Sequence, residues 1–321
     1  MNDFRAPRWL PGGHAQTIWP VFFSRRFEGA RPQFRRERWS TPDGDFVDVD
    51  WLGDDPAAPL LVLFHGLEGS SRSHYAEAFA DEARRRGWRY AVPHFRGCSG
   101  EINLAPRAYH SGDHGEIGWM LERFRAMQRG SIVAVGISLG GNALLRFVEE
   151  AGAAAATRVR AVAAVSAPLD LAAGARAIGR GFGRQIYTRM FLRTMKKKAL
   201  IKLRQHPGLF DAEALRAARD LREFDEVFTG PLHGFTGADD YYARSSAKDR
   251  LARIRIPALV LNARNDPFLP ASALPRAGEV GPCVTLWQPA HGGHVGFASG
   301  PWPGRLRSFP AAVAGWLAAH L

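Results

Sequence analysis

Short apolar runs recur along the chain, and each is bounded by polar or turn-forming residues, which is the pattern of buried β-strands. They lie at residues 60–64, 90–95, 132–137, 159–165, 258–262 and 284–288. Between them, stretches such as HYAEAFADEARRRG, GEIGWMLERFRAM and NALLRFVEEAG carry apolar residues at i, i+3 and i+4 and predict helices. The alternation of strand and helix predicts a doubly wound, mostly parallel α/β sheet.

Two regions depart from this alternation. The residues before 60, including WSTPDGDFVDVDWLG, alternate apolar and polar side chains and predict an antiparallel hairpin at the edge of the sheet. Residues 170–242 show no strand pattern and are too many for a loop, so they predict an inserted helical cap. The expected organisation is a core in two parts, residues 1–169 with an N-terminal extension and residues 243–321, interrupted by the cap at 170–242.

The heptapeptide GISLGGN places Ser138 in the turn between the strand at 132–137 and a helix predicted at 142–150. A G-x-S-x-G pattern at such a turn holds the serine in a strained backbone conformation and exposes its hydroxyl at the carboxyl end of the strand. Gly136 and Gly140 leave room for backbone to approach backbone there. A free hydroxyl is a weak nucleophile, so this interpretation also requires a base, an acid that orients the base, and an oxyanion hole.

Candidates for the acid and the base follow in the chain order Ser, Asp, His that this architecture uses. The acid is Asp266 in LVLNARNDPFLP, whose alternative interpretation is a turn-forming aspartate. The base is His294 in PAHGGHVGF, on a glycine-bounded loop after the last predicted strand. His291 is a competing base, and the H-x-x-H spacing lacks the third ligand that a metal site needs.

The oxyanion hole is predicted from two backbone N–H groups. One belongs to Leu139, directly after the nucleophile, and the other to Leu67 in FHGLEGS, in the loop after the strand at 60–64. His65 in the same loop is interpreted as a structural histidine that holds the hydrogen bonds of the loop. No cofactor and no metal are expected.

These residues belong to a longer series of motifs that resembles the YheT-like branch of the α/β-hydrolase superfamily, a group of serine hydrolases. The matching stretches run from residue 12 to residue 297 and are GGHAQTIWP, HGLEGSSRSHYA, HFRGCSGE, YHSGD, GISLGGN, FTGADDYYARSSA, NARNDPF and GGHVGF. The resemblance implies the α/β-hydrolase fold, a cofactor-free enzyme acting on acyl esters, and a triad of Ser138, Asp266 and His294. Family members often have two acids before PF, where this chain has Asn265 and Asp266, so one acid remains to serve.

The formal net charge is +12, with 43 Lys and Arg against 31 Asp and Glu, and residues 171–210 hold ten of the basic residues and no acid. Two sets recur at every fourth position and are each predicted to line one helical face: Arg176, Arg180 and Arg184, and Arg189, Arg193 and Lys197. Apolar residues lie between them: Ile178, Phe182, Ile186, Met190, Phe191 and Met195. No nucleic-acid-binding signature accompanies the charge, so nucleic acid is not expected as a partner. The segment is interpreted as a solvated cap face above an acyl pocket, or as a basic amphipathic surface resting on an anionic bilayer.

The leading hypothesis is a serine hydrolase that cleaves carboxylic acyl esters through an acyl-enzyme. The alternatives are a membrane-surface phospholipase or acyltransferase with the same triad, and a catalytically silent α/β hydrolase used as a binding module. In HPGLFD, His206 and Asp211 match a spacing of glycerolipid acyltransferases, which is interpreted as coincidence. Two distant cysteines, an N-terminus without an apolar signal core and the lack of any long apolar run predict a cytoplasmic protein, with peripheral membrane contact left open.

Overall fold

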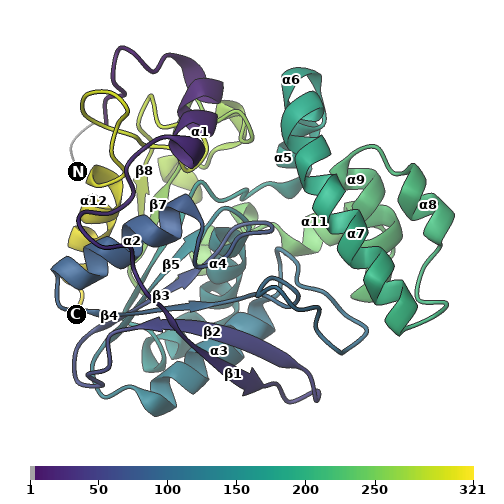
Figure 1. Cartoon of the computed structure of the whole chain (residues 1–321), viewed down its shortest axis with the longest axis horizontal. Helices are drawn as coiled ribbons and strands as arrows, with labels where there is room; N and C mark the ends of the chain where they lie inside the picture. The colour runs from purple at the N-terminus through teal and green to yellow at the C-terminus, as the bar shows by residue number, and fades with distance from the viewer. Residues whose placement is uncertain (1–3) are drawn as a thin grey trace.

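The computed structural model describes residues 4–321 and holds an eight-stranded sheet in the order β1-β2-β4-β3-β5-β6-β7-β8 (Figure 1). From β4 through β8 neighbouring strands run parallel, whereas β1 and β2 form a hairpin that pairs antiparallel with β4. The strands are β1 (Arg35–Ser40), β2 (Phe46–Leu52), β3 (Leu60–Phe64), β4 (Arg89–Pro93), β5 (Ile132–Ile137), β6 (Ala161–Val165), β7 (Ala258–Leu261) and β8 (Val284–Trp287). The predicted doubly wound sheet with an antiparallel edge hairpin is confirmed.

Helices cover both faces of the sheet because its central strands are apolar on both sides. In β3, Leu60, Val62 and Phe64 pack into one core with α3 and α4, while Leu61 and Leu63 pack into the other with α2 and α12. These helices, together with α1 near the N-terminus, are α1 (Gly12–Phe22), α2 (His74–Arg85), α3 (His114–Met127), α4 (Leu139–Ala151) and α12 (Ser308–Ala318). Because the central strands run parallel, their carboxyl ends lie at the same edge of the sheet, where the loops that follow them can form a site.

Between β6 and β7 the chain leaves the sheet and forms a group of helices that stands apart from the α/β body (Figure 1). They are α5 (Leu171–Ile178), α6 (Gly181–Gly183), α7 (Arg189–Gln205), α8 (Ala212–Ala217), α9 (Leu221–Phe224), α10 (Gly230–Leu232) and α11 (Ala238–Ser245), with π-helical turns at Arg184–Thr188 and Asp225–Thr229. The boundary predicted at residue 242 falls within α11, which Asn142 of α4 anchors by donating to Ser245 O at 2.8 Å. None of the helices in residues 4–321 is both long and apolar enough to cross a membrane.

The prediction that Arg176, Arg180 and Arg184 share one helical face is wrong. Helix α5 ends at Ile178, Arg180 has an extended backbone, and Gly181 has a φ of +48°. Two glycines around Arg180 therefore interrupt the periodicity that the spacing implied. The second set, Arg189, Arg193 and Lys197, does lie within α7, and all three are exposed.

Candidate active site

Ser138 lies at the sharp turn between β5 and α4. Its φ of +52° and ψ of −119° are strained for a residue with a side chain, and its N–H donates to Val165 O at 2.8 Å. Helix α4 begins at Leu139, three residues before the start predicted from the sequence. A Cβ on Gly136 would lie 2.4 Å from Gly140 O, and one on Gly140 would lie 2.5 Å from Phe64 O. The turn therefore requires glycine at both positions, as the motif predicted.

A chain of hydrogen bonds joins the predicted serine, histidine and aspartate. His294 Nε2 lies 3.0 Å from Ser138 Oγ, and His294 Nδ1 lies 2.8 Å from Asp266 Oδ2. Because an ionised carboxylate can only accept, the ring proton belongs on Nδ1, which leaves Nε2 free to accept from the serine hydroxyl. Asp266 is 5% exposed, and its other oxygen accepts from the Phe268 N–H at 2.8 Å. His291 is exposed and takes no part in this series of hydrogen bonds.

The two backbone amides predicted for the oxyanion hole border the same pocket as Ser138 and His294. On either side of Leu67, the Gly66 N–H donates to the Tyr75 hydroxyl and the Glu68 N–H to the Tyr109 hydroxyl, both at 2.9 Å. Within residues 4–321, neither the Leu67 nor the Leu139 N–H has a protein acceptor. Both amides are therefore available to a ligand beside the serine hydroxyl.

Helix α1 holds the loop that carries His294, a role that sequence reasoning missed. The His294 N–H donates to Thr17 Oγ1 at 2.9 Å. Gln16 Oε1 accepts from the Gly292 N–H and from Asn265 Nδ2, both at 2.9 Å. Thus one buried glutamine joins the loop that carries His294 to the loop that carries Asp266, through the side chain of Asn265 next to Asp266.

This contact brings backbone against backbone. A Cβ on Gly13 would lie 1.9 Å from Asn265 O, and one on Gly296 would lie 1.8 Å from Gln16 O. The motif GGHAQTIWP, which matched the family without an assigned role, therefore belongs to the support of the site. The contact could not be predicted from the sequence, because the motif lies far along the chain from the loops it contacts and its residue spacing does not indicate them.

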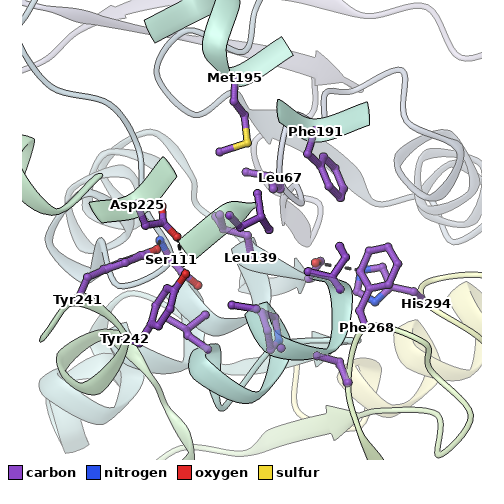
Figure 2. Close-up of a pocket in the computed structure, with 18 residues that line it drawn as sticks. Leu67, Ser111, Leu139, Phe191, Met195, Asp225, Tyr241, Tyr242, Phe268 and His294 are labelled. Carbon is purple, nitrogen blue, oxygen red and sulfur yellow. Dashed lines mark hydrogen bonds between the residues drawn. The ribbon is translucent and has the colours of Figure 1, made fainter. Parts of the chain in front are cut away.

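The pocket beside Ser138 opens to solvent and has a mainly apolar lining. Figure 2 shows Phe191 and Met195 of the cap above Leu67 and Leu139 of the core, with Phe268 beside His294. The Phe268 and His294 rings stack with their centroids 4.0 Å apart. Core and cap thus enclose the serine between them, which restricts water and favours an apolar ligand.

A polar cluster lies across the pocket from His294, at Asp225, Tyr241 and Tyr242 (Figure 2). Burial raises the pKa of Asp225 to about 7, and the nearby acidic Asp220 adds to the rise. The hydroxyls of Thr229 and Tyr242 donate to the carboxylate and oppose the rise without cancelling it.

This raised pKa predicts that Asp225 destabilises the fold as the pH rises. Between the unfolded value of 3.8 and the folded value of about 7, the unfolded chain loses the proton while the folded chain keeps it. Asp225→Asn cannot ionise, so we expect its free energy of unfolding, relative to the unaltered protein, to be about 2–3 kcal/mol higher at pH 8 than at pH 5. Urea unfolding of both proteins at the two pH values measures this difference. An exposed control, Asp239→Asn, should show no such gain, and an equal offset for Asp225→Asn at both pH values would contradict the shift.

Two further histidines behave as the sequence interpretation predicted. His65 is fully buried, its Nδ1 lies 2.8 Å from Gly66 O, and its Nε2 accepts from the Phe95 N–H at 3.0 Å, so it holds its loop as a neutral ring. Burial and the neighbouring His94 lower the pKa of His65 to about 3. His206 bonds to Leu104 O, and Asp211 caps α8, so the acyltransferase-like spacing is accounted for by local structure.

A doubly wound sheet with a serine at a strained strand–helix turn and a histidine on the loop after the last strand defines a class of proteins, the α/β hydrolases. The chain belongs to the α/β-hydrolase fold family, whose model matches residues 59–301.

Individual relatives agree with this assignment. The chain is 38% identical to "Putative esterase YheT" of Escherichia coli (strain K12), over 99% of this chain and 94% of that protein. It is 30% identical to "Phospholipase ABHD3" of Mus musculus, over 92% of this chain and 73% of that protein. A solved thermophilic esterase from Thermogutta terrifontis covers 90% of this chain and 100% of its own, with a TM-score of 0.51 at 18% identity. The resemblance read from the motifs is confirmed.

Proposed function

We propose that the protein hydrolyses carboxylic acyl esters through an acyl-enzyme formed on Ser138. The observation that carries this proposal is the chain of hydrogen bonds from buried Asp266 through His294 to Ser138 Oγ, which ends in an apolar pocket. The names of the relatives, an esterase and a phospholipase, support hydrolysis of an ester bond.

The mechanism follows from the positions of these groups. His294 Nε2 removes the hydroxyl proton as Ser138 Oγ attacks the ester carbonyl carbon, and Asp266 stabilises the imidazolium that forms. The Leu67 and Leu139 N–H groups receive the negative charge on the tetrahedral oxygen. His294 returns the proton to the leaving alcohol, then activates a water that releases the acid and frees the serine.

The apolar lining predicts that longer acyl chains are better substrates until the pocket is full. Each methylene that enters it contributes up to about 0.8 kcal/mol, so kcat/KM for p-nitrophenyl esters should rise up to about fourfold per methylene from acetate onward. Turnover of a series of chain lengths measures this profile. No turnover of any ester by the folded protein would sink the proposal and favour a silent binding module.

Gly174 offers a sharp control of the same profile. A Cβ there would lie 3.6 Å from Pro168 Cβ and 3.9 Å from Leu269 Cδ2, ordinary contacts with two residues that line the pocket. Gly174→Leu should therefore shift the preference to shorter acyl chains while acetate turnover persists. Gly278→Leu, outside the pocket, should leave the profile unchanged.

A second candidate uses the same triad on lipid esters, as a phospholipase or acyltransferase. The observation that favours it is an exposed apolar surface beside the pocket, at Phe182, Ile186 and Met190.

A further inference from the structure

Six of the nine large apolar side chains exposed in the described chain gather at two neighbouring tips, which together we call the docking face. The cap tip holds Phe182, Ile186 and Met190, exposed by 49%, 44% and 53%, and the α1 tip holds Phe22, Phe23 and Trp302, exposed by 68%, 56% and 70%. In Figure 1, α1 and α6 stand at the same edge of the molecule. Apolar surface concentrated in this way is characteristic of an interaction site.

Ring contacts join the two tips. The His14 ring, near the start of α1, lies 4.5 Å from the Phe182 ring. Trp19 of α1 contacts Phe23 at 4.4 Å and Trp302 at 6.4 Å between centroids. Because a helix rises 1.5 Å per residue, the eight residues from His14 to Phe22 span about 12 Å. The two tips are therefore neighbours on the surface, separated by about the length of this stretch of α1.

The segment that carries the cap tip has two sets of apolar side chains, one that lines the pocket and one that is exposed on the surface. Phe191 and Met195 of α7 line the pocket, so they account for the apolar character of its inner side. Phe182, Ile186 and Met190 recur every fourth residue, are about half exposed and do not line the pocket. Core packing does not explain this outer row.

The two segments that carry the docking face are basic. Arg180, Arg184, Arg189 and Arg193 are exposed, and residues 171–210 contain no acid. In the segment that carries α1, Arg5, Arg8 and Arg25 are exposed, and residues 4–27 contain no acid. A second copy of the chain would set arginines against arginines, whereas an anionic lipid surface complements them and receives the apolar side chains.

The docking face adjoins the pocket through a series of aromatic rings. Phe268 stacks on His294, Tyr187 lies 4.6 Å from Phe268, and Phe182 lies 6.1 Å from Tyr187. We propose that the two tips dock the protein peripherally on an anionic bilayer, so that the pocket receives its acyl ester from the membrane. The docking stands on the surface alone, and only the delivery of substrate rests on the proposed function.

Vesicle sedimentation tests the docking without any turnover. The full chain is mixed with vesicles of phosphatidylcholine alone, or with about one third phosphatidylglycerol, at low and high salt. We expect binding to the anionic vesicles that weakens with salt. Phe182→Ser/Ile186→Ser/Met190→Ser should lower the partition coefficient at least tenfold, and each of Arg184→Gln, Arg189→Gln and Arg193→Gln about fivefold.

Matched variants separate docking from damage to the fold. Met127→Ser removes an exposed apolar side chain at the end of α3 and should bind as the unaltered protein does. Phe22→Ser/Phe23→Ser/Trp302→Ser tests the α1 tip independently if the cap variant unfolds. Thermal unfolding and turnover of a soluble ester report the fold of each variant, so loss of turnover tests the proposed function and loss of binding tests the docking.

Four results would overturn the inference. The first is no binding to anionic vesicles, and the second is equal binding to both lipid compositions. The third is a dimer that the apolar variants convert to monomer in sedimentation velocity, because the tips would then cover one another. Binding that depends on arginines but not on either apolar set would also exclude the docking face, since simple adsorption by charge would account for it.

Discussion

Ser138→Ala is expected to lower kcat/KM for p-nitrophenyl esters by about 10⁴- to 10⁶-fold, because the proposed acyl-enzyme forms on the Ser138 hydroxyl. The side chain donates to His294 Nε2 and caps no helix, so its removal should leave the fold intact. Alanine in its place keeps the strained backbone, with φ at +52°. Turnover measured together with circular dichroism and thermal unfolding separates loss of chemistry from loss of structure.

Labelling by a fluorophosphonate identifies the nucleophile directly. The unaltered protein and Ser272→Ala, which changes an exposed serine after β7, should label alike, and Ser138→Ala should not label. Equal labelling of all three proteins would move the nucleophile to another residue. A folded protein that neither labels nor turns over esters would point to a binding module.

The core of the fold could be predicted because its information is local. Buried parallel strands need apolar side chains on both faces, so β5 appears in the sequence as IVAVGI, with the bounds that the structure has. The cap was harder, because its helices pack on their own small cores and on the pocket, and its periodicity was broken at Gly179 and Gly181. Fourfold spacing of arginines does not reveal such an interruption.

Some residues of the site could likewise be predicted from local sequence, and others could not. Ser138 and its turn follow from one short motif, since glycines and serine meet within a few residues. The contacts of Gln16 and Thr17 with the loops of His294 and Asn265 join residues far apart in the chain, and no periodicity announces them. Asp225 likewise could not be singled out from the sequence, because its raised pKa results from its burial in the folded protein.

His294→Ala should lower kcat/KM by about 10⁴- to 10⁶-fold and slow fluorophosphonate labelling as well, because both reactions need a base at Ser138 Oγ. The matched control is His291→Ala, which changes an exposed histidine three residues away. Its kcat/KM should stay within about twofold of that of the unaltered protein. The two histidines competed as bases in the sequence, and only His294 lies 3.0 Å from the serine oxygen and 2.8 Å from Asp266. If His291→Ala lost activity and His294→Ala kept it, the assignment of His294 as the base would be wrong, and the loop would have to bring the His291 ring to the serine during catalysis.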